Sequence, residues 1–174
     1  MSLPLRAGRR LVLVGVLPAA LAVCASCSPA IDLKQTLQVT DVTGGWHDAG
    51  IVDGKNKLVP SLSFRVRKPA DVRLRSLSLN IIFKRVSADK KEEEDLDEVF
   101  LQTVEFSEGN STPLLTVRPE HGYTGDAPQT RAEILQHSQF RDARAVVFAK
   151  QSSTTWVDLL RYDVPRVLLP NQPK

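Results

Sequence analysis

One short run places side chains suited to ligand or metal chemistry next to one another. Gly44 to Gly50 reads Gly-Gly-Trp-His-Asp-Ala-Gly, so Trp46, His47 and Asp48 lie on a glycine-flanked segment. Successive residues of an extended chain point to opposite faces, which keeps His47 and Asp48 from sharing one metal ion readily. Two interpretations stay open: a ligand-binding loop, or a Trp46 that fills one end of the fold while the glycines permit a tight turn.

A second polar run, His121 to Asp126, adds His121, Tyr123 and Asp126. If folding brought this run beside the first, His47, His121 and Asp126 could converge on a metal ion, or two of these groups could serve a hydrolase. An apolar or carbohydrate ligand could instead lie between Trp46 and Tyr123, provided that the two rings line a concave pocket.

The sequence contains no local motif that specifies catalysis. It has no Gly-x-Ser-x-Gly elbow, no glycine-rich phosphate loop and no zincin helix motif. The three histidines, His47, His121 and His137, show no metal-ligand spacing. We therefore expect a protein that is not an enzyme and that holds neither a metal nor a cofactor, apart from a covalent lipid considered next.

The first thirty residues have the pattern of an export signal. Arg6, Arg9 and Arg10 precede the apolar run 11–23, and small residues follow it. The run is too short to span a ~30 Å hydrocarbon core comfortably, and Pro18 interrupts it. A retained single-span anchor is the lesser alternative.

The signal resembles that of bacterial lipoproteins, because it ends in Cys24-Ala25-Ser26-Cys27-Ser28. The resemblance implies that a cysteine at the cleavage point carries the lipid and becomes the first residue of the mature chain. Cys27 follows two small residues, as in that family, and is favoured over Cys24, which follows Val23. Cleavage without lipid attachment stays an alternative.

The resemblance also implies a location. The mature protein is expected to be exported and anchored on the periplasmic side of a membrane, the outer one in a bacterium with two, because Ser28 rather than Asp follows Cys27. The predicted division is a signal peptide over 1–26, a tether over 27–30, a β-sandwich domain over 31–169 and a tail over 170–174.

Charge argues against nucleic acid as a partner. The chain has 23 Lys plus Arg against 20 Asp plus Glu, and the three arginines of the signal account for that whole excess. The exported part is therefore formally neutral, whereas nucleic-acid binding needs a basic surface that neutralises phosphates. Both cysteines precede the predicted domain, so the domain must fold by burial without a disulfide.

Alternation of apolar and polar residues predicts an all-β domain. In 31–40, 58–67 and 72–86, apolar and polar residues largely alternate, which is typical of antiparallel sheets with one buried face. Shorter strands are predicted over 99–106, 114–117, 144–150 and 156–167. Because Pro165 cannot donate a ladder hydrogen bond, the last strand should lie at an edge or break there.

About seven strands and at most one short helix, over 128–137, favour an antiparallel, immunoglobulin-like β-sandwich. Asp53-Gly54 predicts a hairpin turn. The stretch 59–84 resembles the strand pair of the immunoglobulin-like, FxLYD-type domains of exported bacterial lipoproteins; the literal signature is absent, and Ile82-Phe83-Lys84 takes a comparable place. That resemblance implies a fold and transfers no functional residue.

Two further expectations concern a pair of aromatic residues and the acidic charge run. Phe148 and Trp156 are expected in the core, with an aromatic binding stripe as the alternative. The charge run 89–98 is expected to form a solvated, mobile hairpin.

Taken together, the sequence predicts a non-catalytic binding or assembly module at the cell envelope. Its partners would be the membrane, through the lipid, and another envelope protein that binds an edge strand or the loops at one end.

Overall fold

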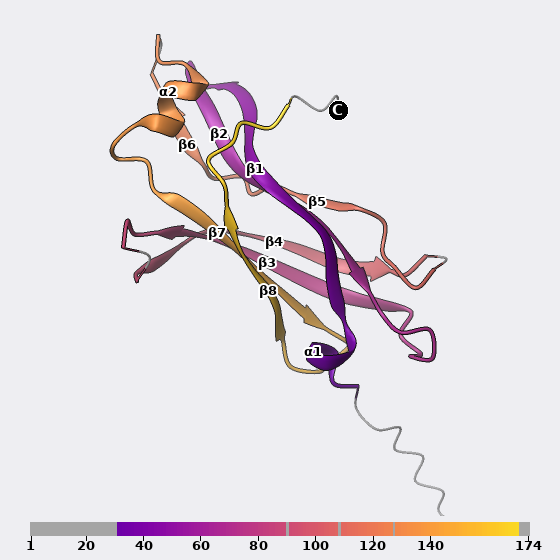
Figure 1. Ribbon diagram of the computed structural model, residues 1–174. Helices are drawn as coiled ribbons and strands as arrows, with labels where there is room; N and C mark the ends of the chain where they lie inside the picture. The colour runs from indigo at the N-terminus through magenta and orange to yellow at the C-terminus, as the bar shows by residue number, and fades with distance from the viewer. Residues whose placement is uncertain (1–30, 90, 108, 127, 171–174) are drawn as a thin grey trace, which may run out of the picture. The chain divides into compact units, whose positions relative to one another are not determined.

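Antiparallel strands dominate the computed structural model, which describes residues 31–89, 91–107, 109–126 and 128–170 (Figure 1). The cysteines, the predicted signal and the predicted tether lie outside the described residues. The described elements, in chain order, are α1 (Leu33–Thr36), β1 (Gln38–Val52), β2 (Lys55–Arg67), β3 (Ser76–Val86), β4 (Glu93–Glu105), β5 (Leu115–Val117), β6 (Tyr123–Gly125), α2 (Arg131–Gln136), β7 (Asp142–Lys150) and β8 (Val157–Val164).

These eight strands form two antiparallel sheets, which confirms the predicted all-β sandwich. One sheet has the order β1-β2-β5, with β6 also paired to β2, and the other has the order β4-β3-β7-β8. The two orders correspond to A-B-E and C′-C-F-G of immunoglobulin-like sandwiches. Neither described helix is long and apolar enough to cross a membrane.

The core forms where the alternating residues of the two sheets face each other. Leu62, Phe64, Ile81, Phe83 and Val147 are fully buried. Their polar neighbours along the strands face outward, as the period of two requires. The Ile82-Phe83-Lys84 run thus contributes a central core ring from β3.

Turns and ends follow local chemistry. Asp53 and Gly54 both have positive φ, 51° and 77°, as a two-residue hairpin turn of the primed type requires. Thr130 caps α2 in a capping box with Glu133, and the helix buries Ile134 and Leu135. Edge strand β8 ends at Val164, immediately before Pro165, as predicted.

Two segments differ from the sequence prediction. Residues 33–36 form α1 rather than a strand, with Asp32 accepting hydrogen bonds from the amides of Lys34 and Gln35. Leu33 and Leu37 are buried as expected, because a spacing of four places two residues on one face in a helix as well as in a strand. The run 41–52 belongs to β1 rather than to a loop.

The chain beyond β8 pairs with the outer side of β1. The amide of Trp46 donates to the carbonyl of Val167 at 2.8 Å, and the amide of Leu169 donates to the carbonyl of Trp46, also at 2.8 Å. A β-carbon at Gly45 would lie 2.8 Å from both the Val167 carbonyl oxygen and Leu169 Cδ2, so only glycine permits this approach.

Substitution Gly45→Ala should therefore loosen the C-terminal segment. The added methyl group collides with backbone as well as side chain, and we expect the free energy of unfolding to fall by about 1–3 kcal/mol. Chemical denaturation measures the loss, and digestion by carboxypeptidase should reach Leu169 faster than in the parent. Thr43→Ala, at an exposed position of the same strand, is the control and should change stability by less than about 0.5 kcal/mol; equal behaviour of the two variants would contradict the close approach.

Candidate functional site

Trp46 lies in the core rather than on a loop. Its side chain is 0% exposed. Its ring makes edge contacts with Phe140 at 4.7 Å and Tyr123 at 5.7 Å between ring centroids. Gly44, two residues earlier, leaves the space that the Tyr162 ring occupies, since a β-carbon there would lie 2.7 Å from Tyr162 Cε1. The Trp46 ring therefore closes one end of the sandwich and offers no open stacking surface.

Asp48 holds a helix in place. Its carboxylate accepts a hydrogen bond from the amide of Gly50 at 2.8 Å and pairs with Arg131 Nε at 3.0 Å. Gly50 follows a bulge in β1 and has a φ of 84°. Asp48 thus stabilises the bulge and ties α2 to β1, which is a structural role.

His47, beside Asp48, has no convergent partner. Burial, followed by the charge of Arg118, lowers the pKa of His47, while Asp48 opposes the shift. Its Nδ1 atom is buried without a hydrogen-bond partner among the described residues. The neutral imidazole is therefore favoured at neutral pH.

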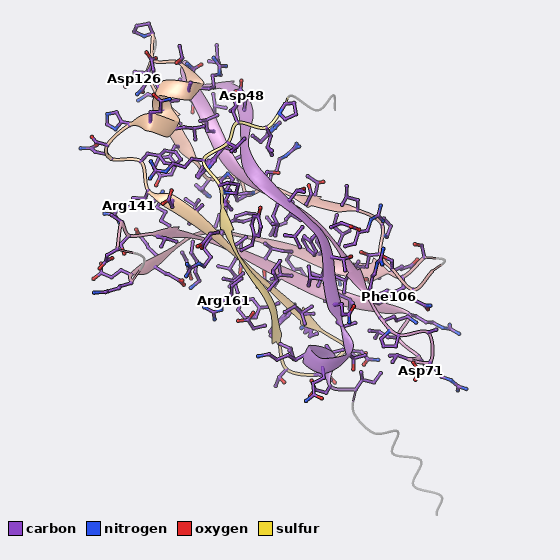
Figure 2. All side chains as sticks on the ribbon, viewed as in Figure 1. Asp48, Asp71, Phe106, Asp126, Arg141 and Arg161 are labelled. Atoms are coloured by element: carbon purple, nitrogen blue, oxygen red, sulfur yellow. The ribbon has the colours of Figure 1, made fainter. Side chains whose placement is uncertain are left out.

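The second polar run is also distributed among structural contacts. The Tyr123 hydroxyl accepts the amide of Arg141 at 3.2 Å, and Asp126 pairs with Lys55 at 3.0 Å. Figure 2 shows Asp126 and Asp48 at the α2 end of the sandwich. The convergence of His47, His121 and Asp126 that a metal site would require has no supporting contact, and the described part of the chain contains no group of three metal-ligating side chains.

His121 instead joins Asp97 of β4. Asp97 Oδ2 accepts hydrogen bonds from the amides of Glu120 and His121 and lies 2.9 Å from His121 Nδ1. Burial opposes ionisation of Asp97, but the hydrogen bonds from His121, Glu98 and Glu120 outweigh it and lower its pKa. This carboxylate fastens the β5–β6 connection to the edge of the other sheet.

Much of the charge run 89–98 contributes to a strand. From Glu93 onward the residues belong to β4. Glu93 bonds Arg144 at 2.5 Å, and Lys84 lies 3.1 Å from Asp95. Neighbouring cations on β3 and β7 therefore compensate part of the acidic run.

The cavities near the candidate loops are small or polar. A cavity of about 210 Å³ is lined by Tyr123, Phe140 and residues of the α2 region, below the usual range for ligand sites of ~300–1,000 Å³. A neighbouring groove of about 680 Å³ includes Arg166. Arg166 already bonds Asp142 at 2.6 Å and the Phe140 carbonyl at 3.2 Å, so it holds the C-terminal segment in place.

An aromatic pair lies on the outer face of the second sheet; an aromatic stripe of Phe148 and Trp156 was the lesser alternative in the sequence analysis, which missed Phe100. Phe100 of β4 is 52% exposed and Trp156, just before β8, is 39% exposed. Their ring centroids lie 5.9 Å apart, edge to face, and Lys150 Nζ lies 4.6 Å from the Trp156 ring. The prediction that Trp156 is a core residue is wrong.

The two rings meet across the sheet. β4 and β8 are its edge strands, with β3 and β7 between them. Asn80 of β3 pairs with Phe100 on one side and Phe148 on the other, so the three side chains share one face, and Phe148 is half-buried there. Asn80 Oδ1 is buried without a hydrogen-bond partner among the described residues. We call Phe100, Phe148, Trp156 and Lys150 the outer aromatic face.

Comparison of the chain with protein-family models, curated proteins and solved structures found no match in any of the three. Within the described residues, polar side chains near the predicted loops serve the fold, while the outer aromatic face has no structural task of comparable weight.

The Asp97 contacts should make the stability of the fold depend on pH. Because the pKa of Asp97 is lowered in the folded state, its contribution to stability is complete above the ordinary pKa of an aspartate and is lost as pH falls through the lowered value. Asp97→Asn should cost about 1–3 kcal/mol at pH 7.

The difference in unfolding free energy between the parent and Asp97→Asn should shrink as pH is lowered from 6 toward 2, measured by denaturation at each pH. Asp71→Asn is the matched control and should follow the parent, because Asp71 is exposed in the β2–β3 connection and its carboxylate forms no ion pair with the described residues. A constant difference between the parent and Asp97→Asn would contradict the ionised contact.

Proposed function

We propose that this protein is an exported, lipid-anchored lipoprotein that serves as a non-catalytic binding or assembly module at the cell envelope. The export signal ending in Cys27, with Cys24 as the alternative, supports export and anchoring. The structural engagement of Asp48, Asp97, Tyr123 and Arg166 supports a role without catalysis, since these groups already bond within the fold.

The outer aromatic face carries the binding part of the proposal. Exposed aromatic rings surrounded by charged groups are typical of the central residues of protein interfaces. Glu98, Lys150 and Asp158 lie around Phe100 and Trp156 on the paired strands. Covering these rings would remove apolar surface from water.

The occupant that these features favour is another envelope protein. A folded protein surface can cover the rings and match the surrounding charges at the same time. A small ligand or carbohydrate held by the Trp46 and Tyr123 loops is the less favoured alternative, because Trp46 is buried and the cavity beside Tyr123 is small.

Crosslinking in the native envelope tests the proposal. A photoreactive residue at Phe100 should capture one reproducible protein, and Trp156→Ala should reduce the yield at least about fivefold, since central aromatic residues commonly contribute more than 1 kcal/mol to binding. The same probe at exposed Ile51, on the β1–β2 hairpin, is the control and should not capture that protein.

The anchor is tested in the same cells. Labelling with a lipid precursor should be lost in Cys27→Ala, and the crosslink should weaken with it; labelling lost only in Cys24→Ala would move the anchor to the other cysteine. A crosslink at Ile51 equal to that at Phe100, or unaffected by Trp156→Ala, would reject the outer aromatic face as the binding surface.

A further inference from the structure

One end of the sandwich collects cations. The β2–β3 connection with its flanks carries Arg67, Lys68, Arg73 and Arg75, against Asp71 as the acidic residue of the same stretch. Lys34 of α1 belongs to the same end, because β1 begins directly after α1 and its first residue pairs with Arg67. We call these five cationic residues the basic end; Figure 2 labels Asp71 and Phe106 there, opposite Asp48 and Asp126.

The basic end gathers cations that have no carboxylate partner among the described residues. The side chains of Lys34, Arg67, Arg73 and Arg75 form no ion pair with a carboxylate of the described residues, and all four residues are exposed. Lys68 Nζ donates hydrogen bonds to the Val72 carbonyl and to Asn110 Oδ1. Several cations in other parts of the fold have a carboxylate partner within 3.0 Å: Lys55 with Asp126, Arg131 with Asp48, Arg144 with Asp163, and Arg166 with Asp142. Lys57, Arg118, Arg141 and Lys150 likewise form no ion pair with a described carboxylate, but none of them belongs to the basic end.

A groove lies within the basic end. It has a volume of about 650 Å³, and its lining includes Lys68, Arg73, Arg75 and, from the β7–β8 turn, Gln151 and Ser152. No carboxylate belongs to this lining within the described residues. Polar donors and uncompensated cations around an open groove suit phosphate groups.

The position of the proposed anchor favours membrane phospholipids as the source of those phosphates. The described chain begins at Ile31, next to α1. If Cys27 carries the lipid, three residues separate it from Ile31, and three or four extended residues reach roughly 10–14 Å. The basic end is therefore the end that the anchor holds near the membrane.

We infer that the basic end binds the anionic phospholipid headgroups of the membrane that holds the anchor, and so sets the orientation of the domain on that surface. This inference rests on the proposed lipid anchor. Each basic residue near an anionic surface contributes about fivefold to the ratio of bound to free forms. Several unpaired cations on one end therefore suffice to favour one orientation over free rotation about the tether.

The test uses the full chain, lipidated in cells and reconstituted into vesicles made with or without phosphatidylglycerol. A fluorophore on Ser153→Cys, in the exposed β7–β8 turn, reports the basic end, and one on Ile51→Cys reports the opposite end. Nitroxide lipids labelled at the headgroup quench a fluorophore that lies at the surface. A chain without an added cysteine controls for labelling of a free native cysteine.

The expected result is strong quenching at Ser153→Cys and weak quenching at Ile51→Cys, in vesicles with phosphatidylglycerol only. Arg73→Gln with Arg75→Gln should lower the ratio of docked to free orientations by on the order of 25-fold. Lys57→Gln with Arg141→Gln removes the same charge from two cations that also form no ion pair with a described carboxylate but lie away from the basic end; this control should keep the quenching.

Equal quenching at both positions would overturn the inference while leaving the anchor intact. The same holds if quenching at Ser153→Cys does not depend on phosphatidylglycerol, or is unchanged by the paired arginine substitutions. A chain that fails to float with either kind of vesicle would reject the anchor itself, and the inference with it. Melting curves of the variants show whether each is folded.

Discussion

The ring packing of Trp46, together with its backbone hydrogen bonds, is the interaction on which the rest of this structure depends. Its ring packs against Tyr123 and Phe140, from β6 and from the segment before β7, while its backbone joins the chain beyond β8. One residue of β1 thereby connects segments that are far apart in sequence. In a domain whose described residues include no cysteine, such burial replaces the constraint of a disulfide.

This closure explains why the polar groups around Trp46 serve the fold. Because the run around Trp46 is a long strand and not a loop, Asp48 stabilises the β1 bulge and pairs with Arg131. In the aromatic cluster, the Tyr123 hydroxyl accepts a hydrogen bond from the amide of Arg141. Asp97 similarly secures the β5–β6 connection. Surfaces available for recognition therefore lie elsewhere, on the outer aromatic face and at the basic end.

Local patterns in the sequence predicted what local physics determines. Alternation identified β2 and β3, and Asp53-Gly54 and Pro165 marked the ends of strands correctly. The glycines at 44 and 45 led to the prediction of a loop or tight turn. In the structure they make room for Tyr162 and Leu169, more than a hundred residues later in the chain. No local pattern signals such a contact, and the same glycines read locally as a turn.

The contact between Phe100 and Trp156 was missed for the same reason. Phe100 lies on β4 and Trp156 just before β8, and sequence alone does not show that β4 and β8 belong to one sheet. A tryptophan beside an apolar strand favours the core on average. Assigning Trp46 and Trp156 to opposite environments required the topology.

Acrylamide quenching of single-tryptophan variants tests this assignment most directly. Trp156→Phe leaves Trp46, for which the account predicts blue-shifted emission and weak quenching. Trp46→Phe leaves Trp156, for which it predicts red-shifted emission and efficient quenching. If Trp46 were readily quenched in a folded variant, the closure of the sandwich described above would be wrong, and the glycine-flanked run would again be a candidate ligand site.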